Sequence, residues 1–265
     1  MSLTDVTFQT LASGSKGNTA LLSWTVAEKR RHALIDCGLP LSALEPLLEA
    51  KGLAPKDLSA LLITHEHSDH IGGVAALTGR TGLPVHMTKG AQRALSGLFD
   101  RLNLKALMPH ESFDLAGLNV HPYPVPHDAR ECVGFTFGRA EGGPRLGYLT
   151  DCGHITPHIV RTLKNCPVLA VESNHCPMML ATGPYPEKLK RRVAGAYGHL
   201  SNDQTAGLLA ALADGLTHVC LTHLSETNNT PLLALASARA VLPPHVALEA
   251  ASQHAPAQPL ALMFG

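Results

Sequence analysis

The sequence predicts an α/β protein that folds as a single domain, residues 1–265. Short apolar segments typical of buried strands alternate along the chain with segments of helical periodicity. The hydrophobic share is 45%, which is enough for a substantial core in a chain of 265 residues. No internal repeat or low-complexity linker divides the chain. These observations favour one large domain over two small ones.

The N-terminal half begins with strands and continues as strand–helix pairs. Apolar runs bounded by turn residues predict strands at Val6–Leu11, Thr19–Trp24, His32–Ile35, Leu61–Thr64 and Val85–Met87. Helices are predicted from a capping box at Ser42 and Glu45 to Gly52, from Ile71 to about Gly79, and over Lys89–Arg101. The Gly-rich loop Ser13–Asn18 lacks the P-loop spacing. It is either a turn that needs positive φ or a place where backbone amides approach a phosphate or the metal site.

The C-terminal half continues the alternation. Strands are predicted at Leu118–Tyr123, Cys132–Phe137, Leu146–Thr150, Val168–Val171, His218–Thr222, His245–Leu248 and Leu260–Phe264. The second and third of these form a hairpin around Gly142-Gly143-Pro144. Thr156, Ser201 and Thr230 are predicted N-cap residues of helices that end near Lys164, Leu212 and Val241. Between Ser173 and His199 the periodic pattern loosens.

Composition excludes several classes of function. Lys and Arg total 21 and so do Asp and Glu, so any phosphate-binding surface must be local. The six cysteines are scattered without a CxxC pair, which indicates reduced thiols in the cytoplasm. No signal peptide is visible, and no apolar stretch approaches the roughly 20 residues that span a bilayer. The sequence therefore predicts a soluble cytoplasmic protein with no membrane partner.

Four potential metal ligands follow the apolar strand that ends at Thr64, and they are His65, His67, Asp69 and His70. Residues two apart in extended backbone point to the same side, so His65 and His67 can reach one cation. Asp69 and His70 can then turn toward a second. Asp69 stands where the zinc-protease helix motif needs its second histidine, which excludes that family. A solvated polar loop is the alternative, but burying these groups beside an apolar strand is costly without a bound partner.

Three further candidate ligands lie elsewhere in the chain. Asp151 and His223 each follow a predicted strand, and α/β folds gather their sites at strand ends on one edge of a sheet. His127 comes from a Pro-rich loop between two strands. For His127 or His223 alone, an ordinary structural histidine is the alternative. With the first four, these residues supply enough nitrogen and oxygen ligands for two cations, and zinc accepts such mixed sites.

The motif His65-x-His67-x-Asp69-His70 resembles the defining motif of the metallo-β-lactamase fold superfamily, and the resemblance covers nearly the whole chain. The later motifs of the dinuclear members are matched by His127 ahead of Gly134-Phe135, by Thr150-Asp151-Cys152-Gly153 and by Thr222-His223-Leu224-Ser225. The resemblance implies a four-layer αβ/βα sandwich of two mixed sheets flanked by helices.

The resemblance also implies a dinuclear site. One metal would be held by His65, His67 and His127, the other by Asp69, His70 and His223, and Asp151 would bridge them. In the family a water or hydroxide bridges the metals as nucleophile, and the aspartate at the position of Asp69 doubles as its base. Two cations about 4 Å apart lower the pKa of that water and clamp the entering and leaving oxygens of a phosphodiester.

Motifs outside the ligands resemble the YycJ/WalJ branch of the superfamily. They are Leu11-Ala12-Ser13-Gly14-Ser15-x-Gly17-Asn18, His127-Asp128-Ala129, Glu172-Ser173-Asn174-His175, Gly198-His199-Leu200-Ser201-Asn202 and His223-Leu224-Ser225-x-x-x-Asn228-Asn229. The branch implies an exonuclease that acts 5′ to 3′ on double-stranded DNA. Cys176 stands where the branch usually has an acidic residue after its Glu-Ser-Asn-His motif, which puts any role of that acid in doubt.

Two features between the fourth and fifth motifs are candidates for substrate contact. His199 lies where tRNA-processing nucleases carry a histidine that contacts the scissile phosphate or protonates the leaving oxygen. The alternative is a structural histidine at the start of the Ser201 helix. A basic run comprises Lys188, Lys190, Arg191 and Arg192. Contact with the phosphate backbone, assigned to Lys190, Arg191 and Arg192, competes with a solvated helix face.

Other hydrolases share the ligand motif. Glyoxalase II-like thioester hydrolysis normally uses a C-terminal helical region, and the tail after His245 is too short for one. The interval from Asp151 to His223 leaves no room for the large inserted domain that some RNA-processing and DNA-repair nucleases carry. β-Lactam hydrolysis would be expected with export, and those enzymes often have Cys at the position of Asp151. A metal-binding scaffold without activity is disfavoured because every ligand is retained.

The leading hypothesis is a metal-dependent hydrolase that acts on nucleic acid, with DNA as the substrate. An RNA-processing nuclease and a glyoxalase II-like enzyme are the alternatives. Nitrogen-rich ligation favours two zinc ions, whereas nucleases of such families often use manganese. The oligomeric state stays open.

Overall fold

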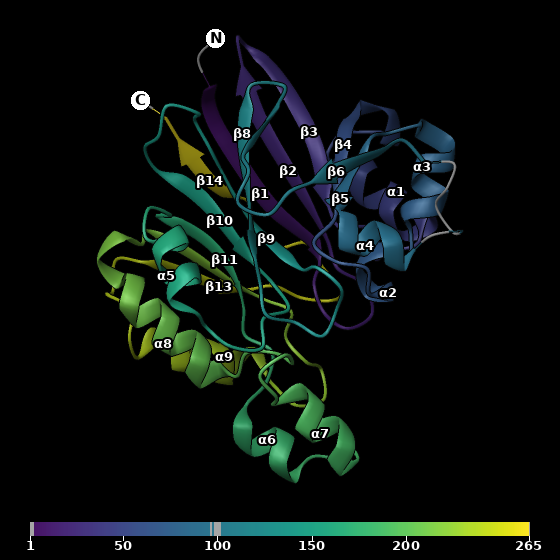
Figure 1. Cartoon of the computed structure of the whole chain (residues 1–265). Helices are drawn as coiled ribbons and strands as arrows, with labels where there is room; N and C mark the ends of the chain where they lie inside the picture. The colour runs from purple at the N-terminus through teal and green to yellow at the C-terminus, as the bar shows by residue number, and fades with distance from the viewer. Residues whose placement is uncertain (1–2, 96, 98–101, 265) are drawn as a thin grey trace.

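The computed structural model describes residues 3–95, 97 and 102–264, which form two β-sheets packed face to face (Figure 1). In order across the first sheet, its strands are β14 (Leu260–Met263), β1 (Leu3–Ala12), β2 (Thr19–Val26), β3 (Lys29–Ile35), β4 (Leu58–Leu62), β5 (Val85–Thr88) and β6 (Leu104–Leu107). Pairing is antiparallel from β14 to β3 and parallel from β3 to β6. The first sheet is therefore mixed.

The second sheet is mixed in the same way. Its strands, in order, are β13 (Ala247–Ala250), β12 (His218–Thr222), β11 (Val168–Glu172), β10 (Arg145–Leu149), β9 (Val133–Gly138), β8 (Leu118–Pro124) and β7 (Phe113–Leu115). Pairing is parallel from β13 to β10 and antiparallel from β10 to β7. Carboxyl ends of neighbouring parallel strands lie at one edge of a sheet, which places several strand ends of this sheet side by side.

Helices cover the outer faces of both sheets. Figure 1 shows one group on the first sheet, comprising α1 (Leu41–Glu49), α2 (Ser68–Ile71), α3 (Val74–Thr81) and α4 (Lys89–Ala94). The second sheet is covered by α5 (Pro157–Leu163), α8 (Asn202–Leu212) and α9 (Pro231–Arg239). Short 3₁₀ turns occupy Pro55–Asp57 and Ala213–Gly215. The predicted four-layer sandwich of two mixed sheets is confirmed.

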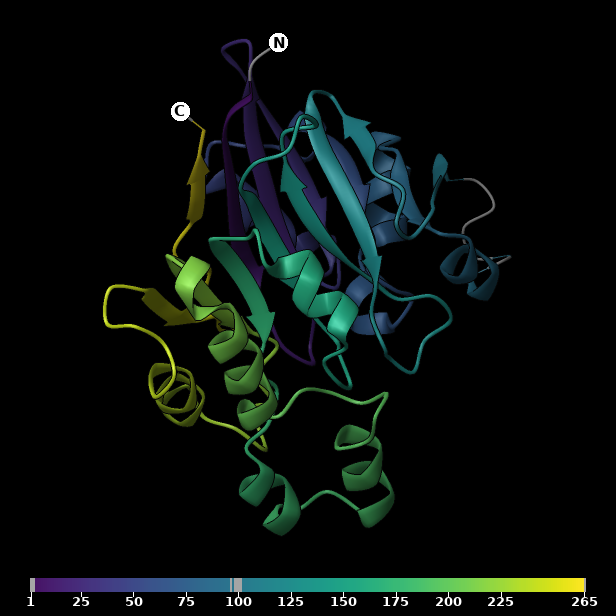
Figure 2. The ribbon, with the colours of Figure 1, turned by 60° about the vertical axis from the view of Figure 1, so that its left-hand side comes forward.

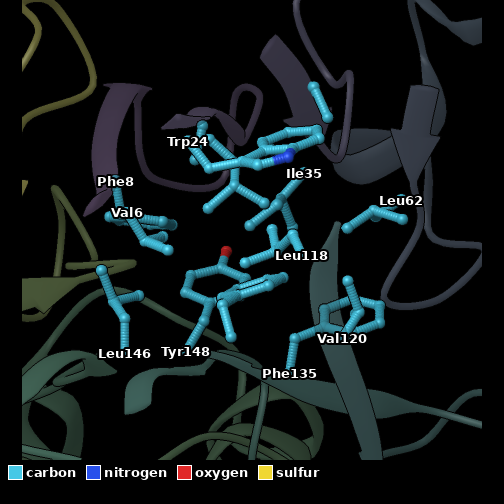
Figure 3. Close-up of a cluster of buried hydrophobic side chains, with 14 of the residues drawn as sticks. Val6, Phe8, Trp24, Ile35, Leu62, Leu118, Val120, Phe135, Leu146 and Tyr148 are labelled. Carbon is cyan, nitrogen blue, oxygen red and sulfur yellow. The ribbon is translucent and has the colours of Figure 1, made fainter. Parts of the chain in front are cut away.

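Apolar side chains fill the space between all four layers. Successive residues of a strand point to opposite faces, so Ala170 of β11 packs in the central cluster while Leu169 packs against the helices. Figure 3 shows the central cluster between the sheets, where Phe8 and Trp24 of the first sheet face Phe135 and Tyr148 of the second. A strand buried on both faces must be apolar along its whole length, which explains why these segments read as continuous apolar runs.

Two helices lie outside the sandwich. They are α6 (Pro177–Thr182) and α7 (Glu187–Val193), which project together from its lower edge in Figure 1 and again in the rotated view of Figure 2. Both fall in the segment where the sequence pattern loosens. Leu180 is the one buried residue of α6, and α7 has none, so neither helix shows the apolar stripe that predicts a helix.

Several element boundaries differ from prediction. The capping box at Ser42 is wrong, because the N-cap of α1 is Pro40, two residues earlier, and it provides no side-chain cap. The helix predicted from Ile71 is two helices, α2 and α3, divided at Gly72-Gly73. Strands β6 and β7 were not predicted. Helix α4 ends at Ala94, and positions 96 and 98–101 of its predicted extent lie outside the described residues.

Three predicted N-caps are confirmed. The side-chain oxygens of Thr156, Ser201 and Thr230 accept hydrogen bonds from the first-turn amides of α5, α8 and α9. No helix in the described part of the chain has both the length and the apolar character that crossing a membrane requires.

Candidate metal centre

Strand ends of both sheets bring the predicted ligands to one edge of the sandwich. In the second sheet, Asp151 follows β10, Glu172 ends β11 and His223 follows β12, and these three strands are parallel neighbours. In the first sheet the loop after β4 carries His65 and His67, and α2 carries Asp69 and His70. His127 lies in the loop between β8 and β9.

The backbone is turned sharply at the ends of three strands, β3, β10 and β12. Asp36, Asp151 and His223 have φ of 55°, 48° and 54°, in the left-handed region that side chains other than glycine rarely adopt. Each such residue costs on the order of 1 kcal/mol or more and persists where the surroundings determine it. Here the turn aims each side chain away from its strand and into the shared site.

The predicted ligands lie in two clusters that share Asp151. The first cluster contains His65, His67, His127 and Asp151, and the second contains Asp69, His70, His223 and Asp151, with one ligand atom per residue within 4.8 Å of the others. His65 Nε2 and His70 Nε2 are 3.2 Å and 3.1 Å from the same oxygen, Asp151 Oδ2. All seven predicted metal ligands therefore converge, in the same two groups that the sequence predicts.

Hydrogen bonds at Nδ1 orient two of the imidazoles so that Nε2 points into the clusters. His70 Nδ1 donates to Asp36 Oδ2 at 2.7 Å, which leaves His70 Nε2 facing Asp151. His127 Nδ1 donates to the Gly198 carbonyl at 2.9 Å. Such hydrogen bonds fix the tautomer of a metal-binding histidine.

Asp36 is a site residue that the sequence analysis did not single out. The side chain is fully buried at the end of β3 and accepts hydrogen bonds from the Thr64 amide (2.8 Å), the Thr64 hydroxyl (2.9 Å) and His70. The only sequence signal is its position after a buried strand, which it shares with Asp151. The contact with His70 depends on the parallel pairing of β3 and β4.

Glu172 is the second residue without an assigned role in the sequence analysis, although its motif was noted. Oε1 accepts from His199 Nδ1 at 2.7 Å and lies 3.2 Å from His223 Nδ1, and Oε2 accepts from the amide of Cys152 at 2.8 Å. Burial alone raises the pKa of a carboxyl, but the charge of His199 and the hydrogen bonds from His199 and His223 lower the pKa of Glu172 to about 2. Glu172 is therefore ionised and holds both histidines in place.

The Gly-rich loop supports the ligands from the opposite side. Asn18 Nδ2 donates to Asp69 Oδ2 at 3.2 Å, and the Ser13 hydroxyl accepts from the amide of His223 at 2.8 Å. Gly38 packs so closely that a Cβ there would lie 1.8 Å from the Asp69 carbonyl oxygen. Gly14 and Gly17 have φ of 150° and 147°. The interpretation as a turn with positive φ is confirmed. The loop reaches the site through the side chains of Asn18 and Ser13, and an approach of its backbone amides to a phosphate or a metal stays a prediction.

The charges and unpaired atoms of the site fit divalent cations. His65 Nε2 and His223 Nε2 are buried and make no hydrogen bond. Burial, together with the charge of His70, lowers the pKa of His65 to about 3. Burial also lowers the pKa of His223, but the neighbouring carboxylates of Asp151, Asp69 and Glu172 raise it to about 10. His223 is thus held protonated beside carboxylates, where a dication would replace the proton, whereas His65 is neutral and could bind a cation directly.

A pocket of about 370 Å³ opens over the clusters, and His67, Asp69, Asp151, His199 and His223 line it. The side chain of His199 is 20% exposed, and its ring stacks on the ring of His223 with 5.1 Å between the ring centroids. A larger cleft of about 1030 Å³ lies at the turns that join β2 to β3 and β9 to β10, and none of the predicted ligands lines it. The smaller pocket is therefore the one that contains the candidate metal ligands and His199.

The structure separates the members of the basic run. Arg192 lines the pocket, whereas Lys190 Nζ donates to the Ala181 carbonyl at 2.7 Å and lies 3.2 Å from Glu187. Arg191 is exposed, and its Nε donates to the Glu187 carbonyl within α7. The three residues predicted to contact substrate are therefore not brought together at the pocket.

The two mixed sheets and the paired His/Asp clusters at their edge define a metal-dependent hydrolase of the metallo-β-lactamase fold. The model of the beta-lactamase superfamily domain matches residues 31–224, and the chain belongs to this superfamily. Within it, the chain is YycJ-like. It is 33% identical over 239 residues to Exodeoxyribonuclease YycJ of Bacillus anthracis, covering 89% of this chain and 88% of the relative.

Two further comparisons agree. Exodeoxyribonuclease WalJ of Streptococcus pneumoniae is 30% identical over 233 residues, covering 86% of this chain and 84% of the relative. The crystal structure of the metallo-beta-lactamase fold protein YhfI of Bacillus subtilis superposes with a TM-score of 0.72 at 14% identity, covering 97% and 99% of the two chains. At this identity the likeness shows the fold alone. The predicted family is thus confirmed.

Proposed function

We propose that this chain is a DNA exonuclease that works with two divalent cations, zinc or manganese. The observation that carries the proposal is that two ligand clusters share Asp151 on the floor of a single pocket. Two relatives that align over most of the chain are exodeoxyribonucleases, which supports DNA as the substrate and, by the family resemblance, attack in the 5′ to 3′ direction on duplex DNA.

The proposed ligands are divided as the clusters are. His65, His67 and His127 would hold one cation and Asp69, His70 and His223 the other, with Asp151 available to both. When bound, such a pair of cations lowers the pKa of a water and neutralises charge on the entering and leaving oxygens of a phosphodiester. Burial raises the pKa of Asp69, but the neighbouring imidazoles of His223 and His70 lower it to about 2. Asp69 is therefore ionised at neutral pH, as both a ligand and a proton acceptor must be.

His199 is proposed to face the leaving group. Nδ1 is engaged by Glu172, so Nε2 is the nitrogen available to a substrate in the pocket. Burial lowers the pKa of His199, but the neighbouring Glu172 carboxylate raises it above its ordinary value. An imidazolium held in this way can donate a hydrogen bond to a phosphate oxygen or a proton to the departing hydroxyl.

The function is tested by offering the purified protein, with manganese or with zinc, several substrates in parallel. They are duplex DNA labelled at the 5′ or the 3′ end, single-stranded RNA, a glutathione thioester and a chromogenic cephalosporin. We expect metal-dependent release of nucleotides from duplex DNA, starting at the 5′ end. The Asp151→Asn variant should lose this activity, whereas Asp214→Asn, which neutralises an exposed aspartate in the Ala213–Gly215 turn, should keep it. Hydrolysis of the thioester alone would overturn the proposal.

A further inference from the structure

The pocket over the metal centre is lined by three aspartates, three histidines and a single side chain that is always cationic. Asp69, Asp128 and Asp151 line it, and among the described residues that line it Arg192 is the only Lys or Arg. A phosphodiester chain entering the pocket meets the cations at the floor, but its neighbouring phosphates lie closer to the rim. Recognition of those phosphates therefore requires a positively charged group at the rim of the pocket.

Asp128 holds Arg192 in place. Arg192 Nε donates to Asp128 Oδ2 at 2.6 Å, and within the described residues neither Nη group makes a hydrogen bond or an ion pair. The other Asp128 oxygen, Oδ1, is 3.4 Å from His127 Nε2 and 3.9 Å from His67 Nε2. The guanidinium is thus tied to the first ligand cluster by one edge and presents its Nη edge to an incoming group.

The backbone around Arg192 is joined to the rest of the site. The Val193 carbonyl accepts from the amide of His199 at 2.9 Å, and the Tyr197 carbonyl accepts from the amide of Asp128 at 3.0 Å. Helix α7 is therefore fastened to the segment that carries His199. The side chain of Arg192 is nevertheless 59% exposed, which places its free nitrogens at the opening of the pocket rather than on its floor.

We propose that Arg192 binds the phosphodiester next to the scissile one, with Asp128 as the residue that positions it. The inference rests on the proposed nuclease function and names the residue that holds the substrate chain. Two Nη–H groups in a fixed plane match two oxygens of one phosphate, which a lysine ammonium cannot do. Lys190 and Arg191 are excluded from this role because the first is tied to Ala181 and Glu187 and the second does not line the pocket.

The test compares steady-state hydrolysis of duplex DNA by the wild type and by Arg192→Ala. We expect KM to rise about tenfold, the value for losing a charge-assisted hydrogen bond, while kcat changes by less than about threefold. Arg192→Lys should recover only part of the loss. Arg161→Ala removes the same charge from the exposed face of α5 and serves as the control. Elemental analysis and thermal unfolding show whether each variant keeps its metals and its fold.

Substrates with a neutral methylphosphonate at one position identify the phosphate. For the wild type, a methylphosphonate beside the scissile phosphate should raise KM about tenfold, and for Arg192→Ala it should add no further increase. Equal KM values for Arg192→Ala and Arg161→Ala, or an undiminished methylphosphonate effect in Arg192→Ala, would overturn the assignment. If Arg191→Ala raised KM as much as Arg192→Ala does, the effect would come from the general positive charge of α7, and the assignment of a single phosphate contact to Arg192 would be wrong. If the wild type itself hydrolyses no DNA, the proposed function fails and this inference fails with it.

Discussion

Replacing Asp36 by Asn tests how the protein prepares His70 to bind a cation. The carboxylate accepts three hydrogen bonds, from the amide and hydroxyl of Thr64 and from His70 Nδ1. An asparagine has one acceptor oxygen and a donor NH₂ group of almost the same shape. If the NH₂ group faces His70, the proton of the imidazole must move to Nε2, the nitrogen that faces Asp151, and that nitrogen can no longer bind metal.

The expected loss of metal affinity or of stability depends on which hydrogen-bond donor loses its acceptor in Asp36→Asn. Loss of a hydrogen-bond partner behind a metal-binding histidine costs about 10- to 100-fold in affinity. If the NH₂ group instead faces the Thr64 amide, a buried donor is unpaired, and the free energy of unfolding falls by about 1–3 kcal/mol. Competition with a chromophoric chelator measures zinc affinity, and urea denaturation of metal-free protein measures stability. Asp214→Asn is the control. Zinc affinity and stability both equal to those of the wild type would refute the reasoning.

Three further predictions concern other parts of the structure. His199→Gln should lower kcat on DNA by about 10²- to 10⁴-fold without loss of bound metal, and an unchanged kcat would exclude His199 from catalysis. Burial raises the pKa of Cys37 and Cys166 to about 12, and Cys176 is the one cysteine that is not buried, so Ellman's reagent at pH 8 should titrate one thiol quickly and none in Cys176→Ser. Ser201→Ala should destabilise the protein by about 1 kcal/mol in urea denaturation, because the Gln204 amide loses its cap, and no loss would contradict that role.

The sequence was most informative where a residue type and its position both carry meaning. The ligands His65 to His70 stand close together, and Asp151 and His223 follow apolar runs that could only be buried strands. N-caps at Ser201 and Thr230 were also predictable, since a hydroxyl at the start of an apolar periodic segment has few other uses. These features depend on residues that are close together in the sequence, so they can be recognised without knowing the tertiary contacts.

Signals that arise only from tertiary contact could not be found in this way. Asp36 and His70 meet because β3 pairs in parallel with β4, and nothing near Asp36 in sequence indicates its partner. Helix α7 has no buried residue, so its segment carries no apolar stripe. For the same reason Lys190 and Arg192 looked equivalent, whereas a contact with Asp128 separates Arg192 from the rest of the run. The capping box at Ser42 failed because Pro40 already provides the extended backbone that precedes α1.

We propose that two cations held around Asp151 make this chain a nuclease. The most direct measurement is a titration of chelator-treated protein with manganese or zinc, in which bound metal and hydrolysis of duplex DNA are recorded at each step. The account predicts no hydrolysis without metal, little with one equivalent, and a plateau at about two metal ions per chain, with both bound metal and hydrolysis strongly reduced in Asp151→Asn. Full activity at one equivalent, or activity that persists after complete removal of metal, would contradict it.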